Sequence, residues 1–150
     1  MRRLLLIIGT ILFLTIHSIS LPKKEDIIKK ADLLLDMMEY EAAVVNYMKI
    51  LPLNPQQRDI RKKIGYAYFQ LNKNDEALKF CRQELKLFPD NGDAYNLLIY
   101  ILFKTDRINE NLDFLERLRL QIRRDKKDLN PGLGDFILGM YFKKKKNYAI

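Results

Sequence analysis

Residues of similar kind recur 34 positions apart along this chain of 150 residues. Four pairs have this separation: Ala31 and Gly65, Leu34 and Tyr68, Ala43 and Ala77, and Pro55 and Pro89. A fixed period of this length is typical of chains built from repeated supersecondary units, each of which buries its apolar face only by stacking on its neighbours. The spacing therefore predicts a stack of similar units.

Within each period the apolar residues follow a helical pattern. The second unit contains two such stretches, at 58–71 and 75–88, with a short polar turn at 72–74 between them. Gly65 and Ala77 are small enough for the two helices to approach each other closely. No segment shows the sustained alternation of apolar and polar residues that a strand requires. The sequence therefore predicts an all-α protein made of stacked helical hairpins.

The most complete unit reads Ile64-Gly65-x2-Tyr68, then Ala77-x3-Cys81, and then Pro89. This pattern resembles the tetratricopeptide repeat (TPR), in which L-G-x2-Y, A-x3-F and P have the same spacings. Cys81 replaces the usual aromatic residue, and Arg61 replaces a frequent Trp. The resemblance implies a right-handed superhelix, an α-solenoid of antiparallel helix hairpins.

Three repeats are expected at about 24–57, 58–91 and 92–125, followed by a partial repeat or an end helix at 132–150. The third repeat keeps its register through Tyr95, Leu98 and Leu102. Asn111 and Arg123 replace its alanine and its closing proline. Together these repeats form one predicted domain, residues 21–150.

The first twenty residues have the pattern of an export signal. Arg2 and Arg3 precede the apolar run 4–16, and Ser18 and Ser20 complete a small-x-small cleavage pattern. We therefore expect residues 1–20 to be a signal peptide that directs export, to a bacterial periplasm or as a secreted protein. An uncleaved membrane anchor formed by residues 4–21 is the alternative, since that segment is near the lower length limit for a span.

The residue types that catalysis commonly uses are scarce after residue 20. The only histidine and the only serines are His17, Ser18 and Ser20. Cys81 lies on the inward side of its predicted helix, and we expect it to be a buried, unreactive thiol. The sequence contains neither a Gly-rich phosphate loop nor the His and Cys ligands of a zinc site. It therefore predicts a non-catalytic protein that has no cofactor and no metal.

The resemblance implies a partner-binding surface, because the first helix of each TPR hairpin lines a concave groove that takes a peptide or a partner helix. The corresponding residues of this chain are Lys62, Tyr66, Phe69, Gln70, Asn96, Tyr100, Phe103 and Lys104. Tyr66 and Tyr100 are one period apart, as are Phe69 and Phe103. Their rings could hold apolar groups of a ligand, and packing between neighbouring helices is the alternative. The predicted function is a scaffold for a protein or peptide partner.

Charged residues narrow the choice of partner. TPR co-chaperones of one type grip an acidic C-terminus with Lys and Asn at fixed groove positions, which here hold Ile28 and Asp32; this exchange argues against such a ligand. The chain has a net charge of +8, and residues 126–150 contain six basic and two acidic residues. This basic tip could contact an anionic membrane surface, so a membrane-anchored assembly or accessory factor is the alternative function. No nucleic-acid partner is expected for an exported protein.

The C-terminal segment 136–142 is apolar on every side, whereas a terminal capping helix has a polar outer face. Two interpretations stay open. The chain is the N-terminal part of a longer repeat protein, or the end helix at 133–147 associates with another chain.

Overall fold

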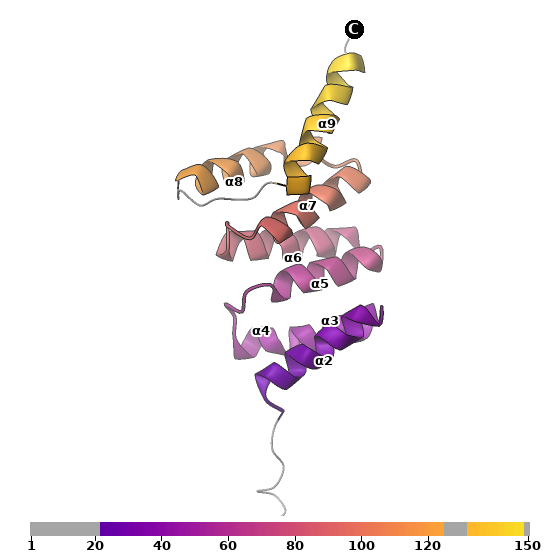
Figure 1. Ribbon diagram of the computed structural model, residues 1–150, viewed down its shortest axis with the longest axis vertical. Helices are drawn as coiled ribbons and strands as arrows, with labels where there is room; N and C mark the ends of the chain where they lie inside the picture. Colours follow the sequence, from indigo (N-terminus) through magenta and orange to yellow (C-terminus); the bar gives the residue numbers. More distant parts are fainter. Residues whose placement is uncertain (1–21, 125–131, 149–150) are drawn as a thin grey trace, which may run out of the picture.

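The computed structural model describes residues 22–124 and 132–148, and all of their regular structure is helical. Figure 1 shows the helices stacked along one long axis, with α2 at one end and α9 at the other. The prediction of an all-α protein with stacked hairpins is therefore confirmed. The predicted export signal, residues 1–20, lies outside the described residues.

The elements are α2 (Lys24–Asp36), α3 (Tyr40–Met48), α4 (Ile50–Leu53), α5 (Ile60–Gln70), α6 (Asn74–Leu87), α7 (Gly92–Lys104), the 3₁₀ helix η1 (Asn109–Asn111), α8 (Leu112–Arg124) and α9 (Gly132–Tyr148). Helix α2 packs on α3, and α5 packs on α6. Contacts of α3 with α5 and of α6 with α7 join successive hairpins. Helix α5 begins two residues later than predicted, because the preceding Asp59 has a left-handed backbone with φ of 70°.

The same turn closes the first helix of all three hairpins. Met38, Asn72 and Asp106 occupy the same position in successive repeats and have φ angles of 62°, 58° and 54°. The next backbone N–H donates to the carbonyl five residues earlier, in the pairs Glu39 to Leu34 (2.8 Å), Lys73 to Tyr68 (2.9 Å) and Arg107 to Leu102 (2.8 Å). This is the Schellman C-cap, whose left-handed position Asn and Asp accept more readily than Met does.

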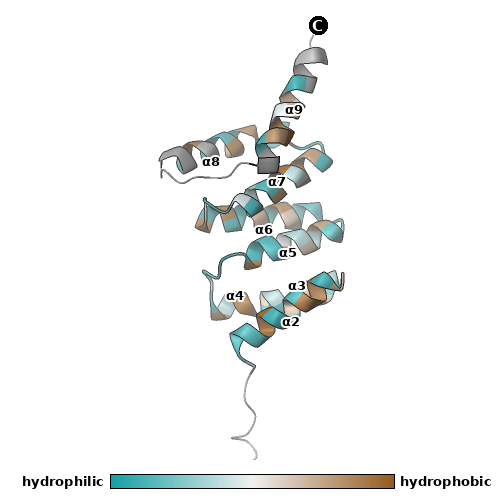
Figure 2. Ribbon diagram, in the orientation of Figure 1, coloured by the Kyte–Doolittle hydropathy of each residue, from teal (hydrophilic) through white to brown (hydrophobic). Residues whose placement is uncertain are grey.

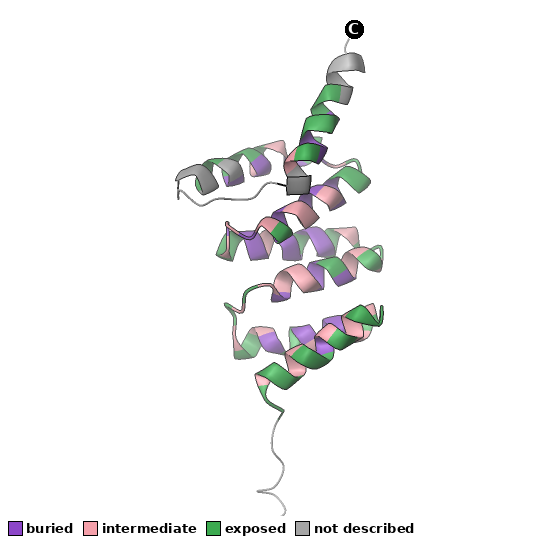
Figure 3. Cartoon of the chain, in the orientation of Figure 1, coloured by how far each residue is buried: buried purple, intermediate pink, exposed green. Residues whose placement is uncertain are grey.

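The core extends along the stack as two apolar clusters. One joins α2–α5 to Phe80 of α6, the other joins α6–α9, and Tyr68 packs against both. The rings of Tyr68 and Phe80 are stacked with centroids 5.6 Å apart. Figure 3 shows that buried residues are concentrated in the middle of the stack and that α2 is largely exposed. The hairpins thus bury their apolar faces against one another, as expected of a repeat array.

Helices α5 and α6 meet most closely at Gly65. A Cβ atom at this position would lie 2.9 Å from the Sγ of Cys81 and 3.1 Å from the carbonyl oxygen of Ala77. Both distances are shorter than ordinary contacts of a Cβ atom, and a backbone carbonyl cannot easily move away. The prediction that a small residue permits this approach is therefore confirmed.

A buried polar network joins the second repeat to the third. Glu84 is fully buried; its Oε1 accepts from the backbone N–H of Asp59 at 2.7 Å and from Nδ2 of Asn91 at 2.9 Å. The Oδ1 of Asn91 accepts from the backbone N–H of Ala94 at 3.2 Å and so caps α7. The network fixes the start of α5 relative to the start of α7, because Asp59 and Asn91 are the residues that precede these helices.

Helix α9 has apolar residues both on the side that packs against the other helices and on its exposed side. Figure 2 shows brown, apolar segments on the part of α9 that extends past α7. The residues packed into the α6–α9 cluster are Ile137, Leu138 and Tyr141. The exposed apolar residues are Phe136, Met140 and Phe142. This exposure agrees with the pattern seen in the sequence, and self-association through residues 133–147 stays a prediction.

Candidate functional site

The eight predicted groove residues lie on two adjacent helices. Lys62, Tyr66, Phe69 and Gln70 belong to α5, and Asn96, Tyr100, Phe103 and Lys104 belong to α7. Helices α5 and α7 contact each other directly, as expected of the first helices of consecutive hairpins. We call this surface the α5–α7 face.

The aromatic rings of the α5–α7 face differ in their burial. Tyr66 and Phe103 are 39% and 41% exposed. Phe69 and Tyr100 are partly buried, and their rings meet edge to face with centroids 5.7 Å apart. The observed ring pair is therefore a diagonal one, Phe69 with Tyr100, and it packs between the helices. Tyr66 and Phe103 are the two rings that remain accessible to a ligand.

The cations of the face are engaged within the chain. The Nζ of Lys62 lies 3.0 Å from Oδ1 of Asp59 and 3.1 Å from Oδ2 of Asp93. Partial burial alone would lower the pKa of Lys62, but the hydrogen bonds to these two carboxylates raise it above its ordinary value. The Nζ of Lys104 lies 5.5 Å from the centroid of the Tyr100 ring, within the range of a cation–π contact. Lys62 thus connects α5 to the start of α7.

Tyr40, which the repeat spacing does not select, also belongs to this face. Its ring meets that of Tyr66 edge to face with centroids 6.3 Å apart. Tyr40 is the first residue of α3, a second helix of a hairpin, so the rule that selects first-helix positions could not find it. The only signal in the sequence is an aromatic residue at the start of a predicted second helix.

Asp32 stands at one of the groove positions where co-chaperones that grip an acidic C-terminus have Lys or Asn. It accepts two hydrogen bonds within the chain. Its Oδ1 accepts from the hydroxyl of Tyr47 and from Nζ of Lys63 at 2.6 Å. Burial and the adjacent Asp32 raise the pKa of the Tyr47 hydroxyl, which therefore stays a donor. Asp32 thus connects the first repeat to the second.

Cys81 is fully buried. Burial, and to a smaller extent the nearby Glu84, raises the pKa of its thiol to about 12. A thiol is a nucleophile only as the thiolate, so Cys81 has no reactive form near neutral pH. Among the described side chains, no group of three or more His, Cys, Asp or Glu residues is arranged to hold a metal ion.

A family model described as tetratricopeptide repeat matches residues 28–92 and again residues 63–127. The chain belongs to the tetratricopeptide-repeat family.

Two curated relatives are similar in sequence. The CTR9 homolog of Arabidopsis thaliana is 32% identical over 72 residues, which are 48% of this chain and 7% of that protein. The small glutamine-rich tetratricopeptide repeat-containing protein 2 of Mycosarcoma maydis is 27% identical over 97 residues, 65% of this chain and 28% of that protein. This chain therefore spans only a minor part of either relative.

Solved TPR structures have the same fold. The first TPR of Spaghetti (RPAP3), bound to the HSP90 peptide SRMEEVD, matches with a TM-score of 0.64 and 20% identity over 85% of this chain and 94% of that one. A structure of MamA matches with a TM-score of 0.57 and 20% identity over 69% of this chain and 59% of that one. These likenesses support the solenoid of helix hairpins that the sequence predicted.

The predicted membrane segment cannot be compared with the structure, since residues 4–21 are outside its described part. Between residues 22 and 124, and between 132 and 148, every helix is too short or too polar to cross a bilayer.

Proposed function

We propose that this TPR chain is a non-catalytic scaffold that binds an extended segment or a helix of a partner protein along the α5–α7 face. The observation that carries the proposal is the exposure of Tyr66 and Phe103 on adjacent helices. Phe69 and Tyr100 belong to the same two helices and pack against each other edge to face. Exposed aromatic side chains supply much of the binding energy at protein interfaces, because they bury a large area at low entropic cost.

Support for a peptide ligand comes from the family and from the fold neighbour that binds an HSP90 peptide. The ligand proposed here has different chemistry from that acidic peptide. TPR co-chaperones of one type use Lys and Asn to grip an acidic C-terminus. At the corresponding positions of this chain, Asp32 is a carboxylate and Ile28 offers no polar group. We therefore propose that the ligand contributes apolar side chains to the rings and that it is not an acidic C-terminal tail.

The test is a selection of random peptides on the full chain, followed by affinity measurements with single variants. Tyr66→Ala and Phe103→Ala should each weaken a selected peptide about tenfold, which corresponds to about 1.4 kcal/mol. Leu53→Ala is the matched control, because Leu53 is an exposed apolar residue of α4, outside the face. The peptide SRMEEVD should not compete. Equal affinities for all three variants, or competition by SRMEEVD, would contradict the proposal.

We also propose that the protein is exported and that residues 1–20 are removed. This proposal rests on the basic start, the apolar run and the small-x-small pattern of the sequence. The mass of the mature chain from its native host tests it. An N-terminus near Leu21 supports export with cleavage, whereas an intact Met1 in the membrane fraction supports the anchor formed by residues 4–21.

A further inference from the structure

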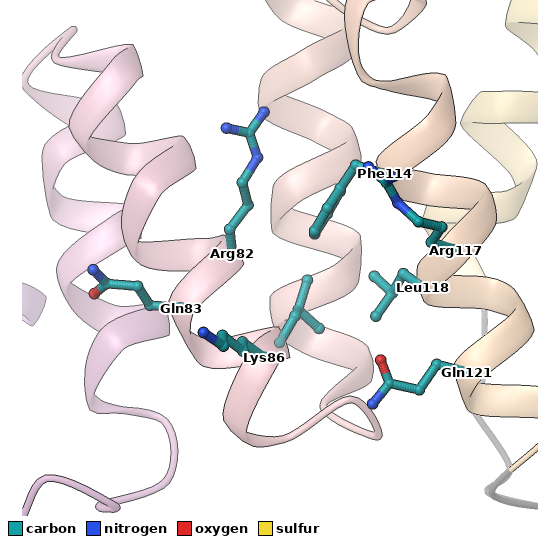
Figure 4. Close-up of a pocket in the computed structure, with 8 residues that line it drawn as sticks. Arg82, Gln83, Lys86, Phe114, Arg117, Leu118 and Gln121 are labelled. Carbon is teal, nitrogen blue, oxygen red and sulfur yellow. The ribbon is translucent and has the colours of Figure 1, made fainter.

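A pocket with a volume of about 320 Å³ opens between α6 and α8, on helices that do not form the α5–α7 face. It is lined by Arg82, Gln83, Leu85, Lys86, Phe114, Arg117, Leu118 and Gln121 (Figure 4). Leu85 and Leu118 are buried, whereas Lys86 and Arg117 are exposed. The lining therefore combines apolar side chains with three cations and contains no carboxylate. We call it the cationic pocket.

Arg82 lies beside the pocket with an unused hydrogen-bond donor. Its guanidinium carbon is 5.5 Å from the centroid of the Phe114 ring, and it donates to Oδ1 of Asn111. Its Nε is buried and has no hydrogen-bond partner among the described residues. The three cations of the lining favour an occupant that carries negative charge.

The chain itself has a surface with the opposite character at the turn between α2 and α3. Met37 and Met38 are 62% and 72% exposed. The exposed carboxylates Asp36 and Glu39 lie on either side of them in the sequence. We call these four residues the methionine knob.

Met38 is an unusual residue at its position. It has the left-handed backbone that the equivalent turns assign to Asn72 and Asp106, and it exposes a large apolar side chain in that strained conformation. Its backbone completes the turn that ends α2, whereas its side chain is exposed and is available for contacts with another chain.

We propose that the methionine knob of one copy of this chain binds in the cationic pocket of a second copy. Methionine is flexible enough to fill an irregular apolar pocket, and its sulfur makes favourable contacts with aromatic rings such as that of Phe114. Asp36 and Glu39 would then approach Lys86 and Arg117, which are the exposed cations of the pocket.

The distribution of charge supports a contact between these two particular regions. Two copies of this basic chain repel each other overall, so association requires patches of opposite sign. The first repeat, residues 24–57, has six acidic and four basic residues. Residues 58–91, which supply the α6 side of the pocket, have eight basic and five acidic ones, and residues 92–125, which supply the α8 side, have six of each. The knob and the pocket lie in different repeats, so the contact is between unlike surfaces of two copies. A contact of this limited size is expected to be weak and to weaken further at high salt.

The experiment uses two full-length copies with different affinity tags, co-expressed and recovered through one tag. Asp36→Lys with Glu39→Lys in both copies should reduce recovery of the second copy about tenfold, since both charge pairs become repulsive. Lys86→Glu with Arg117→Glu in both copies should do the same. Lys29→Glu with Lys30→Glu, on the exposed side of α2, changes charge to the same extent away from the pocket and should leave recovery unchanged.

The decisive sample combines the two reversed forms. A copy with a basic knob and a copy with an acidic pocket are complementary to each other, so co-expression should restore recovery to near the wild-type level. Such rescue also shows that both variants fold. The proposal would be overturned if the wild-type chain did not recover its second copy. It would also be overturned if the charge-reversed variants were recovered as well as wild type, or if combining the two variants did not restore recovery. Loss of recovery only in Phe136→Glu would assign association to α9 and would equally overturn it.

Discussion

Helices α5 and α7 are the first helices of two consecutive repeats, and α6 and α8 are the second helices of the same repeats. The first pair is in contact through Phe69 and Tyr100, whereas the cationic pocket lies between the members of the second pair. A single sequence period therefore produces one side on which neighbouring helices contact each other directly and another side on which a pocket lies between them. Positions that keep the repeat pattern build the stack, and departures from the pattern create its individual sites.

One departure lies at the aromatic pair inside each hairpin. Phe80 and Phe114 occupy equivalent positions in successive repeats. Phe80 stacks on Tyr68, but the residue equivalent to Tyr68 in the third repeat is Leu102, which has no ring. Phe114 instead lies under the guanidinium of Arg82 and lines the pocket.

A second departure lies one turn further along the same helices. Glu84 joins α6 to Asp59 and Asn91, the residues that precede α5 and α7, through two hydrogen bonds. The equivalent residue of the third repeat is Leu118, which cannot accept such bonds and instead lines the pocket. The polar connection that fixes α6 is thus missing at the equivalent position of α8.

The largest expected effect follows from removing that connection. Glu84→Ala leaves the N–H of Asp59 without its acceptor and removes one of the two acceptors of the Asn91 amide. It should lower the free energy of unfolding by about 3 kcal/mol. Urea denaturation measures the loss. Glu76→Ala is the matched control, because Glu76 is exposed on the same helix; it should change stability by less than about 0.5 kcal/mol. Similar losses in both variants would refute the structural role of the network.

The close approach of α5 and α6 gives the next prediction. Gly65→Ala places a methyl group against Sγ of Cys81 and the carbonyl of Ala77, and overpacking of this kind costs about 1–3 kcal/mol. Gly139→Ala on α9 has open space around its new methyl group and should be neutral or stabilising by up to about 1 kcal/mol, because alanine favours a helix. Thermal unfolding of both variants tests the contrast, and equal shifts would show that α5 and α6 are not in close contact.

The α5–α7 face contains rings with two different roles, and their stability effects should separate them. Phe69→Ala removes a partly buried ring and its contact with Tyr100, so we expect a loss of about 1–2 kcal/mol. Phe103→Ala removes an exposed ring and should cost less than about 0.5 kcal/mol while weakening peptide binding. A large loss of stability in Phe103→Ala would mean that this ring packs in the core and is not accessible to a ligand.

The smallest expected effect concerns pH. Partial burial alone would raise the pKa of Asp59, but hydrogen bonds from Lys62 and Asn91 lower it below the ordinary value of 3.8. A carboxylate with a lowered folded-state pKa stabilises the fold above its ordinary pKa, and that stabilisation disappears as pH falls through the folded value. The difference in urea midpoint between wild type and Asp59→Asn should therefore be present at pH 7 and shrink below about pH 4. A difference that grew on acidification would contradict this assignment.

Much of the fold could be predicted from the sequence, because Gly65, Ala77 and the helical periodicity are required by the packing of hairpins. The eight face residues were selected through the resemblance to the tetratricopeptide repeat, because spacing alone does not show which helix of a hairpin lines a groove. The diagonal contact of Phe69 with Tyr100 could not be predicted, because it depends on how neighbouring helices are staggered. The cationic pocket was also missed, since it arises where Leu102 and Leu118 break the repeat.

The proposal that a partner peptide binds the α5–α7 face is tested most directly by photo-crosslinking. A photoreactive phenylalanine analogue replaces Phe103 in one form of the full chain and Leu120 in another, since both residues are exposed but Leu120 lies on α8. The selected peptide of highest affinity should crosslink to the chain with the analogue at position 103 and not to the chain with it at position 120. Crosslinking at position 120 and none at position 103 would contradict the account.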